Sequence, residues 1–104
     1  NYTAKDTRMI TLAVGIAYDD DINKAIKVAS EVVSKHDHVL SDPAPLIATD
    51  ELGDSSVNLV VRPWVKTSDY WTVRRELIKQ IKEAYDEAGI SIPFPQTDVH
   101  LHNK

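Results

Sequence analysis

The sequence predicts an α+β fold in which one sheet carries two helices on one face. Three observations indicate this fold: a long segment of alternating large and small apolar residues, two amphipathic helical segments, and a hairpin between the helices. The elements follow one another as strand, helix, strand, strand, helix, strand. This is the order of the split βαβ, or ferredoxin-like βαββαβ, arrangement. A tail strand over residues 97–104 comes after it.

The first predicted strand covers residues 8–18. Large apolar side chains occur at every second position, with mostly small ones between them, which is the period of a strand whose sheet is covered on one side. The large side chains are Ile10, Leu12, Val14, Ile16 and Tyr18.

The first helix is predicted to begin after three consecutive aspartates, Asp19 to Asp21. Aspartate at this position accepts hydrogen bonds from the free N–H groups of the first turn and opposes the helix dipole. Three carboxylates can also bind a hard cation, but the spaced ligands and mid-loop glycine of a calcium loop are missing. Capping is therefore the favoured interpretation. The apolar stripe comprises Ile22, Ala25, Ile26, Ala29, Val32, Val33 and His36.

The segment between the helices is predicted to form a hairpin. Its strands cover residues 45–52 and 55–65, and Gly53-Asp54 makes the turn. Pro63 cannot donate to a ladder, so it marks a bulge or the end of pairing. Right-handed crossovers would place the first and third strands side by side and parallel in the centre of the sheet.

The second helix is predicted from Ser68 or Asp69 to Ala88, where Gly89 supplies the left-handed residue that ends it. A short edge strand over residues 90–92 would follow, ended by Pro93. The predicted buried stripe is Trp71, Arg74, Leu77, Ile78, Ile81, Ala84, Tyr85 and Ala88. The predicted i,i+4 ion pairs are Lys79–Glu83 and Lys82–Asp86.

Composition excludes several classes of function. The chain has 104 residues, enough for one domain, and a net charge of −4. Its basic residues are scattered among acidic ones, which disfavours binding to nucleic acid or to anionic lipid. No cysteine is present and no apolar run reaches the roughly 20 residues that cross a bilayer. Because the chain begins at Asn1 rather than Met, we expect a piece of a longer protein.

No motif in the sequence predicts an enzyme or a cofactor site. The three glycines are too far apart to cradle a phosphate, and no nucleophile elbow is present. His36 and His38 flank Asp37, and His100 and His102 would share one face of a strand. Zinc or copper held by these histidines is the alternative to solvent-facing side chains, and we expect no metal because no further ligand is positioned to complete the shell.

Arg62, Trp64, Tyr70 and Trp71 gather around the third strand and the second helix. They are predicted to form an aromatic cluster at the edge of the core with an arginine lid. A subunit contact is the functional alternative, because tryptophan, tyrosine and arginine are enriched in the centres of interfaces. Base stacking on RNA is disfavoured because the central strands carry few aromatic residues.

Two segments carry a resemblance to a known family. Residues 51–65 (ELGDSSVNLVVRPWV) and 88–96 (AGISIPFPQ) resemble the hairpin and the sheet exit of the small-conductance mechanosensitive channel (MscS) family. Residues 14–19 and 41–45 add weaker similarity, in the family's order. The whole chain, 1–104, is therefore similar to that family's cytoplasmic C-terminal α/β domain.

The resemblance implies a function that the residues alone do not. Family members are homoheptamers of the bacterial inner membrane, and their transmembrane helices and middle β domain have no counterpart here. Seven copies of the C-terminal domain form a cytoplasmic cage through which ions and small solutes pass, and membrane tension opens the pore on hypo-osmotic shock. The domain would meet the membrane only through those absent segments.

The resemblance also implies contact residues. Pro93, Phe94 and Pro95 would lead toward the cage floor, and Val99 and Leu101 would belong to a tail strand in a small axial barrel. His100 and His102 depart from the polar and basic residues expected there, and would make the floor charge depend on pH near 6.5. The oligomer and cage contact candidates are Arg62, Trp64, Trp71, Pro93, Phe94, Pro95, Val99 and Leu101. The alternative is a stand-alone ferredoxin-like binding or sensor module, metal-linked through its histidines.

Overall fold

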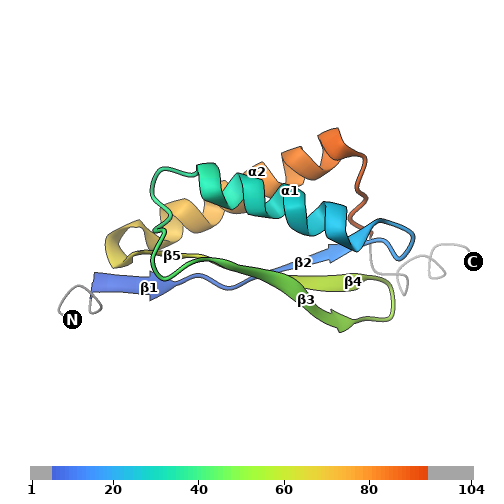
Figure 1. Cartoon of the computed structure of the whole chain (residues 1–104), viewed down its shortest axis with the longest axis horizontal. Helices are drawn as coiled ribbons and strands as arrows, with labels where there is room; N and C mark the ends of the chain where they lie inside the picture. The colour runs from blue at the N-terminus through green and yellow to red at the C-terminus, as the bar shows by residue number, and fades with distance from the viewer. Residues whose placement is uncertain (1–5, 94–104) are drawn as a thin grey trace, which may run out of the picture.

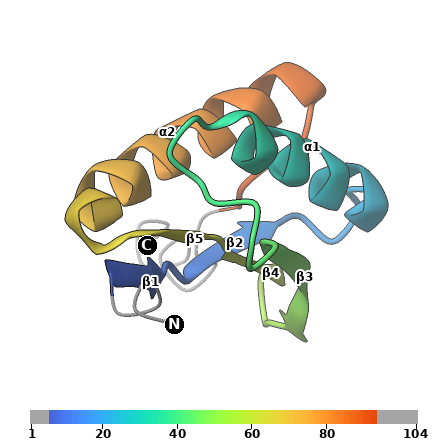
Figure 2. The same cartoon turned by 60° about the vertical axis from the view of Figure 1, so that its left-hand side comes forward.

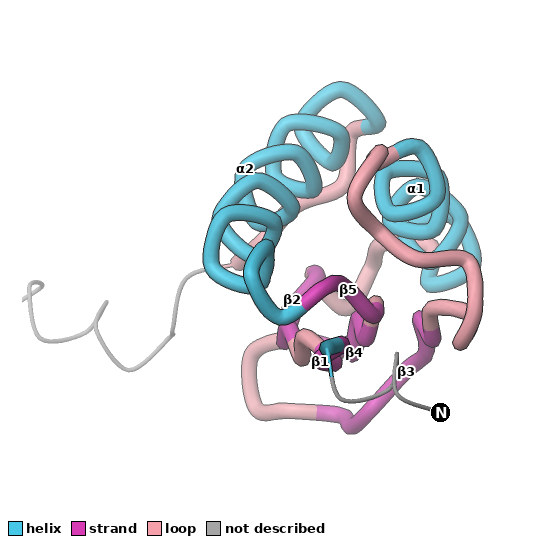
Figure 3. Tube along the Cα trace, turned by 90° about the vertical axis from the view of Figure 1, so that its left-hand side faces the viewer, coloured by secondary structure: helices cyan, strands magenta, loops and turns pink. Residues whose placement is uncertain are grey.

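The computed structural model describes residues 6–93, and in them two α-helices lie together on one side of the strands (Figures 1 and 3). This confirms the predicted α+β class and the placement of both helices on one face. The elements are β1 (Thr7–Met9), β2 (Leu12–Ile16), α1 (Ile22–Lys35), β3 (Leu46–Leu52), β4 (Val57–Arg62), β5 (Trp64–Lys66), the 3-10 helix η2 (Thr67–Asp69) and α2 (Tyr70–Ala88).

The strands form two sheets rather than one. A three-stranded sheet has the order β2-β4-β3, and a two-stranded sheet pairs β1 with β5 (Figure 2). The first predicted strand is thus divided between β1 and β2, and the third is divided at Pro63 between β4 and β5. The break between β1 and β2 lies beside the break between β4 and β5, because the Ile10 N–H donates a hydrogen bond to the Pro63 carbonyl at 2.8 Å. Pro63 ends the longer ladder as predicted, because it has no N–H to donate.

The first and third predicted strands are neighbours, as predicted, but their predicted parallel direction is wrong, and β2 lies at an edge of the three-stranded sheet rather than in its centre. β2 runs antiparallel to β4, with Leu12 opposite Val61 and Ile16 opposite Val57. β3 is also antiparallel to β4. The helix crossover makes β2 and β3 parallel to each other and leaves a gap between them. The hairpin then turns β4 back into that gap, so β4 is antiparallel to both of its neighbours.

The predicted edge strand over residues 90–92 does not form. These residues make one backbone hydrogen bond to the end of β2, from the Ala17 N–H to the Ser91 carbonyl at 3.0 Å, and the Ile90 N–H donates back to the Tyr85 carbonyl of α2 at 2.9 Å. The Ser91 N–H donates instead to Asp20 Oδ2 at 2.8 Å, and Pro93 has no N–H to continue a ladder. The predicted tail strand, residues 97–104, lies outside the described residues.

Asp21 caps α1, as predicted from the acidic triplet. Its Oδ1 accepts hydrogen bonds from the N–H groups of Asn23, at 2.9 Å, and Lys24, at 3.2 Å. The fully buried positions of this helix are small or β-branched: Ala25, Ala29 and Val33. Small side chains at a helix contact allow close approach of the neighbouring backbone, and α1 packs directly beside α2 (Figure 1).

The buried face of α2 differs from the predicted stripe. The buried residues are Val73, Leu77, Ile81 and Tyr85, spaced four apart along the helix. Trp71 and Ile78, which the prediction placed in the stripe, are 56% and 46% exposed. Trp71 and Ile78 fit the three- and four-residue spacing of a buried stripe, but the buried face is centred on the line that includes Val73, which is not in the predicted stripe. Gly89 ends the helix at φ 76° as predicted.

The two ion pairs predicted on the outer face of α2 are confirmed. Lys79 Nζ lies 2.7 Å from Glu83 Oε2, and Lys82 Nζ lies 2.5 Å from Asp86 Oδ2. Both pairs are exposed, so their contribution to stability is small.

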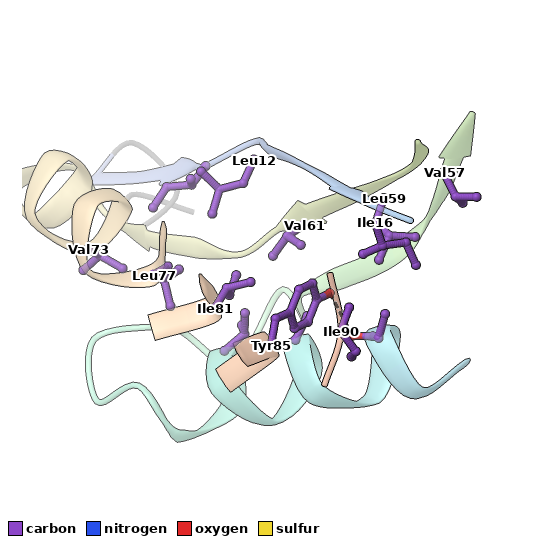
Figure 4. Close-up of a cluster of buried hydrophobic side chains, with 14 of the residues drawn as sticks. Leu12, Ile16, Val57, Leu59, Val61, Val73, Leu77, Ile81, Tyr85 and Ile90 are labelled. Carbon is purple, nitrogen blue, oxygen red and sulfur yellow. Dashed lines mark hydrogen bonds between the residues drawn. The ribbon is translucent and has the colours of Figure 1, made fainter. Parts of the chain in front are cut away.

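One core lies between the helices and the sheets (Figure 4). It is aliphatic apart from Tyr85, which is fully buried and is the largest side chain of the core. The Tyr85 hydroxyl donates to the Ala25 carbonyl at 2.9 Å, so it joins α2 to α1 and leaves no buried hydroxyl unsatisfied. Burial raises the pKa of Tyr85 to about 12.

We expect the stability of the domain to fall steeply in alkali because of Tyr85. Its pKa rises from 10.0 to about 12 on folding, so this contribution is complete below pH 10 and is lost as the pH rises toward 12. Two units correspond to roughly 2–3 kcal/mol of unfolding free energy. Denaturant unfolding between pH 8 and pH 11.5 should show this loss in the parent and not in Tyr85→Phe. Tyr18→Phe changes an exposed tyrosine and is the matched control, which should lose stability in alkali as the parent does. A loss of stability that persists in Tyr85→Phe, or one that disappears in Tyr18→Phe, would contradict the prediction.

A second prediction concerns the cap of α1. Asp21→Ala should lower the unfolding free energy by about 1 kcal/mol, because two N–H groups of the first turn lose their acceptor. Asp19→Ala removes the same charge from an exposed position before the cap and should change stability by less than half as much. Equal losses in the two variants would show that charge alone, and not the hydrogen bonds, is responsible.

Candidate functional site

The predicted cluster of Arg62, Trp64, Tyr70 and Trp71 is divided between two surfaces. Every second residue from the end of β4 into β5 is fully buried: Val61, Pro63 and Val65. Side chains alternate along a strand, so Arg62 and Trp64 lie on the face that the helices leave uncovered. Both are half-buried there.

The uncovered face places Trp64 opposite Met9 in the β1–β5 pair and Arg62 opposite Leu46 in the β3–β4 pair. The Trp64 carbonyl accepts a hydrogen bond from Leu40 N–H at 2.8 Å, which fixes the end of the α1–β3 connection. Arg62 Nε is buried without a hydrogen-bond partner among the described residues. A buried guanidinium N–H that has no hydrogen-bond acceptor costs free energy. Among the contact candidates, Arg62 is therefore the one for which an acceptor from another chain would be most favourable.

Tyr70 and Trp71 form the second surface, at the start of α2. Their rings meet edge to face, with centroids 4.9 Å apart. The Arg8 guanidinium carbon lies 3.9 Å from the Tyr70 ring centroid, and that of Arg74 lies 6.0 Å from the Trp71 centroid. Each contact has the geometry of a cation–π interaction, worth about 0.5–1 kcal/mol at an exposed position.

The arginine that covers the aromatic pair is thus Arg8 and not Arg62. Sequence reasoning missed Arg8 because it lay within a predicted strand. The pairing of β1 with β5, which places Arg8 opposite Val65 and close to the start of α2, is a long-range fact that no local pattern carries. Among the described residues, no ring contact joins Trp64 to Tyr70 or Trp71.

The remaining contact candidates lie at the C-terminal end. Pro93 is half-buried and follows Ile92 at the last described position. Phe94, Pro95, Val99 and Leu101 lie outside the described residues. A role in subunit contacts stays a prediction for all eight candidates.

His36 and His38 fix the connection after α1 against the second helix. His36 has only 6% of its side chain exposed, and its Nε2 lies 2.6 Å from Glu76 Oε1. Its Nδ1 accepts a hydrogen bond from the His38 N–H, and His38 Nδ1 lies 3.5 Å from Asp69 Oδ2. An Nδ1 that accepts leaves the ring proton on Nε2, where it is donated to Glu76.

The solvent-facing interpretation is therefore wrong for His36. Within residues 6–93, no three histidine, cysteine or acidic side chains come together in a way that could hold a metal ion. His100 and His102 lie outside that range. The helices of the described range are also too short or too polar to cross a membrane.

Comparison with known proteins places this arrangement in a family. Residues 10–92 match the family model described as the C-terminal part of the mechanosensitive ion channel MscS. An uncharacterized MscS family protein of Synechocystis sp. is 48% identical over 97% of this chain. The small-conductance mechanosensitive channel of Edwardsiella ictaluri is 40% identical over 98% of it. The chain spans only 34% and 36% of the lengths of these relatives.

Solved structures agree with the sequence comparison. The closed-state crystal structure of Helicobacter pylori MscS superimposes with a TM-score of 0.81 at 33% identity, over 86% of this chain and 36% of that one. The cryo-EM structure of the wild-type AtMSL1 protein shares the fold, with a TM-score of 0.75 at 16% identity over 91% of this chain and 35% of that one. The chain therefore belongs to the MscS family of mechanosensitive ion channels and corresponds to the C-terminal domain of that family.

Proposed function

We propose that this chain is the cytoplasmic C-terminal domain of a tension-gated channel that releases ions and small solutes on hypo-osmotic shock. The observation that carries the proposal is the match of residues 10–92 to the MscS C-terminal family model, together with 40% identity to a small-conductance mechanosensitive channel. Seven copies would form a cage on the cytoplasmic side of a bacterial inner membrane. Transmembrane segments elsewhere in the parent protein would supply the pore.

The surface of the domain supports a role in assembly. Its exposed large apolar side chains are Met9, Tyr18, Leu46, Leu52, Trp71, Ile78 and Ile92. Single exposed apolar residues are ordinary, but several here lie on strand edges and beside grooves, where a neighbouring chain can cover them. Arg62 Nε, buried and without a hydrogen-bond partner among residues 6–93, adds a donor that a neighbouring copy could satisfy.

The alternative, a stand-alone module linked to a metal through its histidines, has less support. His36 and His38 each face a carboxylate, Glu76 and Asp69, across the α1–α2 side of the domain. These pairs account for both histidines as structural contacts.

The channel function is tested in a bacterial strain that lacks its own mechanosensitive channels. Cells that express the full-length parent protein should survive transfer from high to low osmolarity, because an opened pore releases solutes before the envelope ruptures. Cells with an empty vector should lyse. A parent protein that is present in the membrane but gives no protection would contradict the proposal.

The contact role of the exposed aromatic pair is tested by Trp71→Ala. Trp71 is 56% exposed, so its removal should lower the unfolding free energy of the domain by only about 1–2 kcal/mol, through loss of its contacts with Tyr70 and Arg74. Removing an interface aromatic should nevertheless lower the temperature at which the full-length oligomer dissociates on native gels. Lys79→Ala, an exposed change on the outer face of the same helix, is the control. Equal behaviour of the two variants would remove Trp71 from the contact surface.

A further inference from the structure

The ring of His36 holds the start of the connection between α1 and β3. His36 is the C-cap of α1, and only 6% of its side chain is exposed. Both ring nitrogens are engaged: Nε2 lies 2.6 Å from Glu76 Oε1, and Nδ1 accepts a hydrogen bond from the His38 N–H at 3.1 Å. One ring thus joins the end of α1 both to α2 and to the first residues of the connection.

These two contacts of His36 require a neutral imidazole. A ring nitrogen accepts a hydrogen bond only when it carries no proton, and a protonated ring donates from both nitrogens. Because Nδ1 accepts from the His38 N–H, the ring proton lies on Nε2 and is donated to Glu76. A second proton can bind only at Nδ1, toward which the His38 N–H already points. The contact with Glu76 survives proton uptake, and the contact with the His38 N–H does not.

The charged and polar groups around this ring come from α1, the connection, η2 and α2. Those that line the surface hollow at His36 are Lys35, Asp37, His38, Glu76 and Gln80. Asp69 of η2 lies farther out, with its Oδ2 3.5 Å from His38 Nδ1. Lys35 and the His38 ring, whose centroid is 6.0 Å from that of His36, are the cationic neighbours. A proton on His36 strengthens its bond to Glu76, because that bond then joins opposite charges.

Three consecutive backbone N–H groups fix the connection, and the first of them depends on the His36 ring. The His38 N–H donates to His36 Nδ1, and the Val39 N–H donates to the His36 carbonyl at 3.2 Å. The Leu40 N–H donates to the Trp64 carbonyl at 2.8 Å. Loss of the first contact would therefore loosen the segment that leads from α1 toward the edge strand β3.

We propose that His36 is a proton-controlled switch for the α1–β3 connection. The neutral ring holds α2 through Nε2 and the connection through Nδ1. In mild acid the ring takes up a proton at Nδ1, keeps Glu76 as its partner, and becomes a donor toward the His38 N–H. Two donors cannot bond to each other, so the connection separates from the end of α1 while the two helices stay joined. Histidine is the side chain that ordinarily changes charge between pH 5 and pH 8. This switch belongs to the fold and would operate whether or not the parent protein is a channel.

Hydrogen exchange of the connection tests the switch. In the full-length protein, mass spectrometry follows the backbone amides of residues 37–40 at pH 7.5 and pH 5.5, with labelling times scaled for the pH dependence of the exchange chemistry itself. Exchange of these amides should be several-fold faster at pH 5.5, because the His38 N–H has lost its acceptor. The amides of residues 25–33 in α1 are the internal reference, and their exchange should not change.

Two substitutions separate the roles of the two ring nitrogens. His36→Asn places an uncharged amide oxygen near the position of Nδ1, so the connection should stay protected at both pH values. His36→Gln reaches toward Glu76 as Nε2 does but offers no acceptor near Nδ1, so the connection should exchange fast at both pH values. His38→Gln keeps the backbone N–H and removes the second imidazole, so it should keep the pH dependence of the parent. The reference amides of α1 show whether each variant is folded.

Four outcomes would overturn the proposal. Equal exchange of residues 37–40 at the two pH values would show that proton uptake does not release the connection. Slower exchange at pH 5.5 would show that the ion pairs with Glu76 and Asp69 fasten the connection instead. A pH dependence that persists in His36→Asn would place the responsible proton on another group. A pH dependence that disappears in His38→Gln would assign it to the His38 ring.

Discussion

The structure depends on the position of β4 between β2 and β3. Its inward side chains Val57, Leu59 and Val61 are fully or almost fully buried and form the centre of the core under both helices. Because β4 is so apolar, it is paired with a strand on each side and covered by helices on one face. The pairing determines the places of β2 and β3, and the covering determines the place of the helices. The neighbours of β4 must run antiparallel to it and therefore parallel to each other. α1 supplies the crossover that this direction demands.

The central place of β4 also determines what is left exposed. With β4 inside, β2 and β3 become the two edges of the sheet, and the face that carries Arg62 and Trp64 has no helix over it. α2 lies over β2 but leaves Ile78 outside the core, and residues 90–93 make one backbone hydrogen bond to the end of β2, from the Ala17 N–H to the Ser91 carbonyl. The exposed apolar positions of this domain are thus consequences of its topology. An assembly of copies is the arrangement that can cover them.

Local signals in the sequence predicted much of this structure. Asp21, Gly89 and Pro63 act through their own backbone chemistry, so cap, helix end and strand break were predicted at the correct residues. The first and third predicted strands are neighbours as predicted, but their direction was predicted wrongly. The crossover makes the first and second predicted strands parallel, and the hairpin then makes the third antiparallel to both. The face of α2 was partly mispredicted because Trp71 and Ile78 also fit the spacing of a buried helical stripe, whereas the helix buries the line of Val73, Leu77, Ile81 and Tyr85. Arg8 over Tyr70 depends on a pairing between distant strands and has no local signature.

Fold alone does not establish what the domain does, since ferredoxin-like α+β units serve many functions. The family match supplies the channel context, and the assembly role proposed within it would use features that the described residues present: a single aliphatic core, strand edges without a further partner, and exposed apolar side chains. Current recording from membrane patches that contain the full-length parent protein tests the central claim most directly. A tension-gated channel should give unitary current steps whose open probability rises with suction applied to the patch. Patches in which the protein is present, but whose current does not respond to tension, would contradict it.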